Sequence, residues 1–266
     1  MLLLFAATPV ERALDYLTGE VPRWKAENGC YSCHNNGDAA RALMAGGRGA
    51  AIADTLAWLS NPDAWDKEQA DAAFRDKDLA RVQFAFALSE AVERGLVKDR
   101  AALARAAASL PAVKEDSEIG SPATYGQALA LAARIRVLRA AGLTATAQEA
   151  ALRAMKARNT PEHAAQVLAL RVPPAPLLAL QNPDGGWGPY RYAPSEVFDT
   201  ALAILALLEA GAAPAGVVPR AVAWMEKQQL ENGGWPATTR PSGGVSYAQH
   251  ISTTGWATLA LLKAGR

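Results

Sequence analysis

The stretch that decides the fold occurs twice: residues Gln181–Trp187 read QNPDGGW and residues Gln229–Trp235 read QLENGGW. Both follow the pattern Gln-x-x-x-Gly-x-Trp, with two adjacent glycines before the tryptophan. Glycine after Asp or Asn is typical of a tight turn, because glycine adopts backbone conformations that other residues avoid. The sequence therefore predicts the same kind of turn at two places.

Each of these turns leads into a leucine-rich segment, and these segments repeat as well. Asp199 to Gly211 (DTALAILALLEAG) aligns with Thr253 to Gly265 (TTGWATLALLKAG), with a shared Leu-Ala-Leu-Leu core and a shared Ala-Gly ending. A glycine just past a leucine-rich run predicts a helix that ends in a left-handed cap. Helices with wider polar faces lie between these apolar ones.

The alternation predicts twelve helices in six pairs. The helices with wider polar faces include residues 10–17, 50–59, 101–110, 146–158 and 218–230, and the apolar helices begin near Asn35, Leu79, Tyr125, Glu162, Val197 and Ile251. Thr8-Pro9-Val10-Glu11 predicts a capping box with proline at the first helical position, and a second helix is expected to start the same way at Thr160. Strand signals are weak, so the predicted fold class is all-α.

The Gln-x-x-x-Gly-x-Trp turns resemble the QW repeat of squalene cyclases and of the related terpenoid cyclases and prenyltransferases. In that family the glutamine braces a helix end and the tryptophan packs over it. The resemblance implies an α/α toroid of about six inner and six outer helices, formed by residues 9–266 as a single domain. It is specific for the fold and says little about function.

A third copy of the turn contains both cysteines of the chain. Residues Glu27–Tyr31 read ENGCY and match Glu231–Trp235 (ENGGW) position for position, with Tyr31 in place of the tryptophan. Lys25 stands in place of the glutamine, so this copy is expected to be braced differently.

The residues Cys30-Tyr31-Ser32-Cys33-His34 have the pattern of c-type haem attachment. Two thiols add to the vinyl groups of one porphyrin, and the histidine that follows supplies the proximal imidazole. The pattern predicts one covalently attached haem c per chain, with His34 as an iron ligand, and a role in electron transfer or haem-based sensing. From Trp24 to Leu43 the chain also resembles bacterial cyclase-like proteins that carry a cytochrome-type motif.

Two further residues are predicted to lie near the haem. In a closed ring the sixth inner helix neighbours the first, so His250 is expected beside His34, as a distal iron ligand or a pocket residue. Tyr247 lies in the same loop and is expected nearby. A histidine at a helix start that merely caps the helix and faces solvent is the alternative for His250. His163 is expected across the ring in a structural role.

Other functions stay open for the cysteines and for the ring. The CxxC pair could form a disulfide or hold zinc with His34 and one further ligand, whereas a thioredoxin-like pair would need a βαβ unit. A second hypothesis is a squalene-cyclase-like or prenyltransferase-like isoprenoid enzyme, although no Asp-x-Asp-Asp or Asp-Asp-x-x-Asp run is present. A third is a non-catalytic binding toroid. Whether the chain is an enzyme is left open.

Composition and the N-terminus limit the partners and the location. A formal net charge of +1 gives no electrostatic footprint for nucleic acid. No apolar run approaches the eighteen residues that indicate an integral membrane segment. Residues 1–8, MLLLFAAT, resemble the remnant of an export signal, so a periplasmic or otherwise extracytoplasmic location is predicted. The expected partner is an unknown redox partner or a small molecule.

Overall fold

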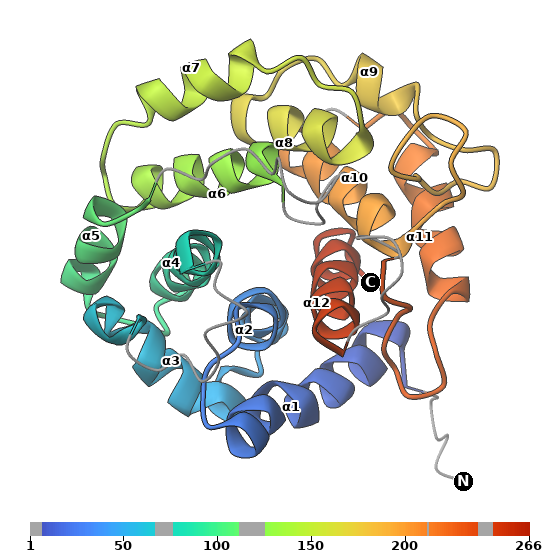
Figure 1. Ribbon diagram of the computed structural model, residues 1–266. Coiled ribbons are helices and arrows are strands. Elements are labelled where there is room, and N and C mark those ends of the chain that lie inside the picture. Colours follow the sequence, from blue (N-terminus) through green and yellow to red (C-terminus); the bar gives the residue numbers. More distant parts are fainter. Residues whose placement is uncertain (1–6, 67–76, 112–125, 212, 239–246) are drawn as a thin grey trace, which may run out of the picture.

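Helices alternate between an inner and an outer ring in the computed structural model (Figure 1), which describes residues 7–66, 77–111, 126–211, 213–238 and 247–266. The inner ring is formed by the π-helix η1 (Cys33–Ala39) continued by α2 (Ala40–Ala45), and by α4 (Lys77–Glu93), α6 (Gln127–Ala140), α8 (Thr160–Leu170), α10 (Val197–Glu209) and α12 (Tyr247–Lys263). The predicted α/α toroid is confirmed. Residues 1–6 of the predicted export signal lie outside the described residues.

The outer ring begins with α1 (Pro9–Asn28) and with α3 (Ala53–Leu59), which the short 3-10 helix η2 (Gly49–Ile52) precedes. It continues with α5 (Arg100–Ala108), α7 (Thr146–Ala154), α9 (Ala175–Leu178) and α11 (Val217–Lys227), while the 3-10 helix η3 (Pro62–Ala64) links α3 towards α4. Among the described residues no helix is long and apolar enough to cross a membrane.

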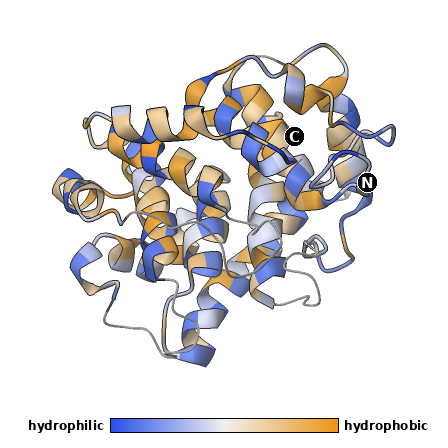
Figure 2. Ribbon diagram, turned by 45° about the horizontal axis from the view of Figure 1, so that its top comes forward, coloured by the Kyte–Doolittle hydropathy of each residue, from blue (hydrophilic) through white to orange (hydrophobic). Residues whose placement is uncertain are grey.

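The inner helices are buried on nearly all sides, and their sequences explain why. Residues 82–92 of α4 and 251–261 of α12 are buried without interruption, and Figure 2 shows hydrophobic residues (orange) on helices throughout the molecule. A helix that is apolar all round is stable only when other helices cover every face. Each inner helix therefore needs two inner neighbours and an outer partner.

The capping residues set where the helices begin. At α1 the predicted capping box is confirmed: the Glu11 amide donates to Thr8 Oγ1 (3.2 Å) and the Thr8 amide donates to Glu11 Oε2 (2.7 Å). At α8 the cap is Asn159, one residue before the predicted start, because its Oδ1 accepts from the Glu162 amide (2.9 Å). The Thr160 hydroxyl donates to the Gly188 carbonyl oxygen instead (2.6 Å).

The helix α1 is longer than the sequence analysis predicted. It does not end at Leu17 but continues through Pro22 to Asn28, where Gly29 closes it in the left-handed conformation (φ 69°). The buried positions Leu14, Leu17 and Val21 extend the apolar stripe past the predicted end. An internal proline removes one helical hydrogen bond, and the burial of this stripe outweighs that loss.

The repeated turns brace one outer helix against the next. In the second copy, Gln229 Nε2 donates to the carbonyl oxygens of Gly233 (2.8 Å) and Pro9 (2.7 Å), and Trp235 Nε1 donates to the Met225 carbonyl oxygen (2.8 Å). The first copy repeats this arrangement: Gln181 Nε2 donates to the Gly185 and Val217 carbonyl oxygens, and Trp187 Nε1 donates to that of Leu177. The bracing role expected for the glutamine is confirmed.

The cysteine-containing copy keeps part of this bracing. Lys25 Nζ donates to the Gly29 carbonyl oxygen (3.1 Å), which corresponds to the bond from Gln229 to Gly233. Tyr31 stacks on Trp58 of α3, with 4.4 Å between ring centroids. The expectation of a different brace is therefore only partly right, because the ammonium group replaces the amide in one of its two bonds.

The last unit closes the ring by packing on the first. Gln229 holds the start of α1 through Pro9, and α12 packs against α1 and η1. Gly255 allows this approach, since a Cβ at that position would lie 2.7 Å from Ala39 Cα. The ring closure thus depends on direct backbone contact between α12 and η1.

The substitution Gly255→Ala should destabilise the protein by about 1–3 kcal/mol, because the added methyl group must push α12 away from the η1 backbone. Gly19→Ala is the matched control: Gly19 lies on the exposed face of α1, and a Cβ added there would have nothing within 4 Å of it. That change should be neutral or stabilising by up to about 1 kcal/mol. Urea unfolding measures both. Equal stability of the two variants would contradict the tight α12 contact.

Candidate functional site

The cysteine turn lies where the first inner helix begins. Gly29 ends α1, and Cys33 is the first residue of η1. Cys30 and Cys33 are both partly exposed, and no disulfide joins them. Cys33 also packs against the hydrophobic core of the ring.

A local capping arrangement fixes His34 on the first turn of η1. Ser32 Oγ accepts from the His34 amide (3.2 Å), and the Ser32 amide donates to Asn36 Oδ1 (2.9 Å). Cys33 Sγ lies 3.5 Å from His34 Nδ1. Burial lowers the pKa of the imidazole below its usual range, and the nearby Asp38 carboxyl opposes this shift. His34 is therefore mainly neutral near pH 7.

A π-helical turn follows, and it carries buried polar side chains. π-Turns are rare and occur frequently at functional sites. Asn35 Nδ2 donates to the Glu20 carbonyl oxygen (3.1 Å), and Asn36 Nδ2 donates to Thr55 Oγ1 (2.9 Å). These bonds tie the start of η1 to α1 and α3.

The buried carboxyl group of Asp38 lies at the end of this π-turn. Its side chain is only 2% exposed, and Oδ2 accepts hydrogen bonds from Gln83 Nε2 of α4 (3.0 Å) and Ser252 Oγ of α12 (2.8 Å). Burial raises the pKa of Asp38 above its usual range, against the opposing effects of the Arg41 and His34 charges and of hydrogen bonds from Ser252 and Trp256. The protein therefore favours the neutral, proton-carrying form of this acid.

The guanidinium of Arg41 lies one helical turn beyond Asp38. Its Nη1 is 3.9 Å from Asp38 Oδ1, while Nε and Nη2 donate to Glu90 Oε1 at 3.1 and 2.9 Å. The guanidinium carbon also lies over the rings of Phe86 (3.8 Å) and Trp256 (4.6 Å). Three inner helices, η1/α2, α4 and α12, supply these residues.

Burial along the same three helices shows from which side the cluster can be reached. The residues just before the buried stretch, His34, Arg81 and His250, are partly exposed, and at least the next ten residues of each helix are buried. Asp38 lies within the first turn or so of that buried stretch. A ligand would reach it from the rim at which the inner helices begin.

The three other residues named by the sequence analysis, Tyr247, His250 and His163, have different surroundings. Tyr247 is the first residue of α12, and its hydroxyl oxygen is 3.2 Å from Asn35 Nδ2 and 2.7 Å from Glu20 Oε2. His250 packs edge-on against Tyr16 of α1 (5.7 Å), and a Cβ on Gly234 would lie 2.9 Å from its Nε2. His163 is at the start of α8.

The sixth inner helix neighbours the first, as predicted. Ser252 of α12 donates to Asp38 of η1, and His250 lies two residues earlier, where its ring packs against Tyr16 of α1. A hydrogen bond to the Trp235 backbone also favours the charged form of His250, although burial lowers its pKa overall. The contacts of His250 therefore favour a role in holding the last turn on α1.

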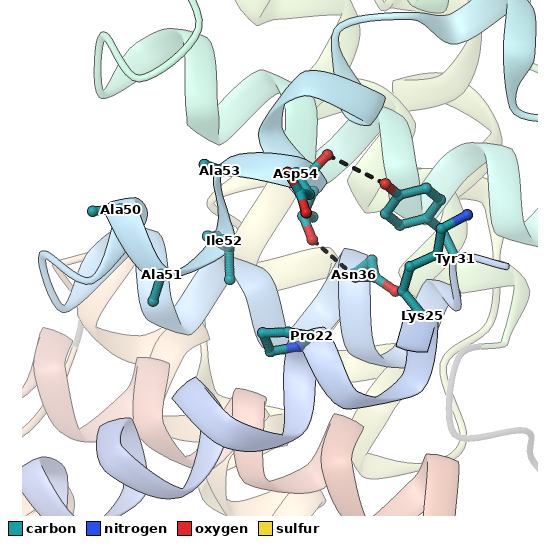
Figure 3. Close-up of a pocket in the computed structure, with 10 residues that line it drawn as sticks. Pro22, Lys25, Tyr31, Asn36, Ala50, Ala51, Ile52, Ala53 and Asp54 are labelled. Atoms are coloured by element: carbon teal, nitrogen blue, oxygen red, sulfur yellow. Dashed lines mark hydrogen bonds between the residues drawn. The ribbon is translucent and has the colours of Figure 1, made fainter. Parts of the chain in front are cut away.

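A small cavity of about 210 Å³ lies beside the cysteine turn (Figure 3). Lys25, Tyr31 and Asn36 line one side of it, and residues 50–55 line the other. The Tyr31 hydroxyl group donates to the Asp54 carbonyl oxygen across this space (3.5 Å). The cavity is below the usual range for small-molecule sites, roughly 300–1,000 Å³. Among the described residues, no three His, Cys, Asp or Glu side chains converge on a metal site.

Sequence reasoning missed Asp38, a buried carboxyl group on the first inner helix. It looked for aspartate-rich runs, whereas here one aspartate is buried among partners on two other helices. The available signal was an acidic residue within an apolar inner helix, in the stretch Asn35-Asn36-Gly37-Asp38. Buried charges are rare enough that such a residue is a functional candidate.

Comparison with known proteins agrees with this architecture. The model of the squalene-hopene cyclase C-terminal domain matches residues 177–266, and no curated protein matched the sequence. The apo structure of the type II terpene cyclase MstE from Scytonema is similar with a TM-score of 0.59 at 14% sequence identity, over 96% of this chain and 98% of that one. A variant of MstE in complex with its substrate, geranylgeranyl dihydroxybenzoate, gives a TM-score of 0.57 at 14% identity, over 96% and 97% of the two chains. The chain therefore has the α/α toroid fold of the terpenoid cyclases.

Proposed function

We propose that this protein binds an isoprenoid at the helix-start rim of the ring and protonates it from Asp38. The observation that carries the proposal is a fully buried carboxyl group, with a raised pKa, in the interior of a terpenoid-cyclase toroid. The similar MstE structure holds geranylgeranyl dihydroxybenzoate, so a prenylated small molecule of that size is the proposed substrate class.

The geometry of Asp38 suits a proton donor. Because Oδ2 accepts hydrogen bonds from Gln83 and Ser252, Oδ1 is the oxygen left to carry the acidic proton. The positive charge of Arg41 lies 3.9 Å from Oδ1 and favours release of that proton. Burial raises the pKa of Asp38 and so favours the protonated form, while the nearby cation favours release of the proton.

The reaction needs no oxidant or reductant. The proton on Oδ1 adds to one carbon of a terminal C=C bond, and the cation at the other carbon is attacked by the next C=C bond, which forms a C–C bond. Loss of a proton, or addition of water, ends the sequence. Asp38 then regains a proton from solvent, so the net change is isomerisation or hydration.

Turnover in D₂O tests this function. Incubation with geranylgeranyl dihydroxybenzoate, or with squalene, should give a cyclised product that carries one deuterium on carbon, seen by mass spectrometry. Asp38→Asn should lower the rate at least about 100-fold, because the amide cannot supply the proton. Asp78→Asn, an exposed aspartate in the first turn of α4, is the matched control and should leave the rate unchanged. No product from either compound, or a fully active Asp38→Asn variant, would refute the proposal.

The raised pKa of Asp38 also predicts a pH effect on stability. The folded state holds this proton more tightly than the unfolded state, so the contribution is complete below the ordinary pKa of 3.8 and is lost as pH rises through the folded pKa. The free energy of unfolding of the wild type, relative to Asp38→Asn, should therefore fall as the pH is raised from about 4. Urea unfolding at a series of pH values measures it. A difference that does not change with pH would contradict a raised pKa.

Covalent haem attachment is the second candidate function, and the cysteine turn favours it. Cys30 and Cys33 are partly exposed and not joined to each other, and Ser32 holds His34 on the next turn. This donor set fits a haem c: each thiol S–H would add across a vinyl C=C bond without an oxidant, and His34 would be the proximal ligand. The haem would supply one-electron transfer in an extracytoplasmic protein.

Expression together with a periplasmic haem-ligation system decides this candidate. A Soret band that stays with the protein after denaturation is expected for attached haem, and Cys30→Ala with Cys33→Ala should abolish it. His250→Ala should leave the spectrum unchanged, because its ring packs against Tyr16 and the backbone of the last turn. A colourless full-length protein with both thiols reactive would exclude haem attachment and leave the isoprenoid proposal intact.

A further inference from the structure

The deeper part of the ring contains two aromatic faces and a carboxylate that together form a cation site, and the Arg41 side chain of the protein occupies it. The guanidinium carbon of Arg41 lies 3.8 Å from the centre of the Phe86 ring and 4.6 Å from that of Trp256. Glu90 Oε1 accepts two hydrogen bonds from the same group. The Arg41 and Glu90 residues are only 4% and 7% exposed. Two aromatic faces and a carboxylate are the groups that bind a desolvated organic cation most strongly.

This site is not fully satisfied by its own residues. Arg41 Nη1, Glu90 Oε2 and Gln83 Oε1 are buried and form no hydrogen bond with the part of the chain that the structure describes. A buried ion pair with open hydrogen-bonding positions costs more desolvation energy than a well-packed apolar plug of the same volume. Stability alone therefore does not account for an arginine here.

The order of contacts along three inner helices places this site below Asp38. In each helix the residue at the level of Asp38 comes before the residue at the level of the guanidinium: Asp38 and Arg41, Gln83 and Phe86, Ser252 and Trp256. A helix rises about 1.5 Å per residue, so three or four residues correspond to roughly 5 Å. Seen from the rim, the guanidinium lies behind the acid.

We infer that Arg41 is a resident cation that closes the ring below Asp38 and limits how far an apolar ligand can extend into it. The effect on ligand length rests on the proposed function, whereas the cation site does not. The Arg41 guanidinium already covers the faces of Phe86 and Trp256, so these two rings cannot stabilise a carbocation that forms near Asp38. C–C bond formation is thereby confined to the rim side of Asp38, which makes Arg41 a specificity-determining residue.

Chemical rescue tests the cation site directly. Arg41→Ala should lower Tm, and free guanidinium at low millimolar concentration should raise it again by about 2–4 °C as it takes the vacated place. Sodium chloride at the same ionic strength is the reference. The matched control is Arg136→Ala on α6, where the guanidinium pairs with Glu93 (2.7 Å) and is 39% exposed; its Tm should not respond to guanidinium. No rescue of Arg41→Ala, or equal rescue of both variants, would overturn the inference.

Failure of Arg41→Ala to fold would not prevent the test. Its refolding yield in guanidinium, compared with sodium chloride, then becomes the readout, and a gain of at least twofold is expected. Arg41→Met keeps a long side chain over the two aromatic rings without the charge, so it should fold and show no guanidinium response. A response in Arg41→Met equal to that in Arg41→Ala would show that guanidinium acts elsewhere.

Ligand length is measured separately by tryptophan fluorescence with farnesol and geranylgeraniol as probes. Wild-type protein should prefer the shorter alcohol, and Arg41→Ala should gain at least threefold in affinity for the longer one relative to Arg136→Ala. An unchanged preference would refute the effect on length. If neither alcohol binds wild-type protein, the proposed isoprenoid function fails, while guanidinium rescue still decides whether Arg41 occupies a cation site.

Discussion

The closure of the ring is the constraint on which the other features depend. An inner helix whose side chains are buried on nearly every face cannot be stable at an open end, so the sixth inner helix must pack on the first. Two contacts meet this requirement. In the last repeated turn Gln229 donates to the Pro9 carbonyl oxygen, and Gly255 allows α12 to contact the η1 backbone at Ala39. Both contacts join residues more than two hundred positions apart.

The candidate site is assembled by the same closure. Asp38 accepts one hydrogen bond from Ser252, which lies 214 residues later in the sequence, and Arg41 packs on Trp256 of the same helix. An open ring would expose the carboxyl group to water and remove the cause of its raised pKa. The raised pKa of Asp38 thus depends on ring closure. A variant that loosens the packing of α12 should therefore lower both the stability of the ring and the pKa of Asp38.

The turns could be predicted from the sequence because their causes are local. Two adjacent glycines, a glutamine four residues before the first of them and a tryptophan after the pair determine the brace within seven residues. The role of Asp38 could not be predicted in this way. Its raised pKa comes from its surroundings, and its hydrogen-bond partners Gln83 and Ser252 are 45 and 214 residues away in the sequence. For His250 the helix could also be placed from the sequence, whereas the contact of its ring with Tyr16, 234 residues earlier, could not.

The first inner helix contains the residues of both proposed functions, haem attachment and proton donation, and both functions need the same place at the rim. His34 and Asp38 are four residues apart on η1, and the proposed route of a ligand to the buried Asp38 runs from the rim past His34. A macrocycle held by Cys30, Cys33 and His34 would lie at that entrance and keep an isoprenoid from the acid. An isoprenoid that reached Asp38 would, in turn, fill the space next to the imidazole. The two candidate functions therefore exclude each other in a single molecule, and a protein fully loaded with haem should show no proton transfer to an alkene.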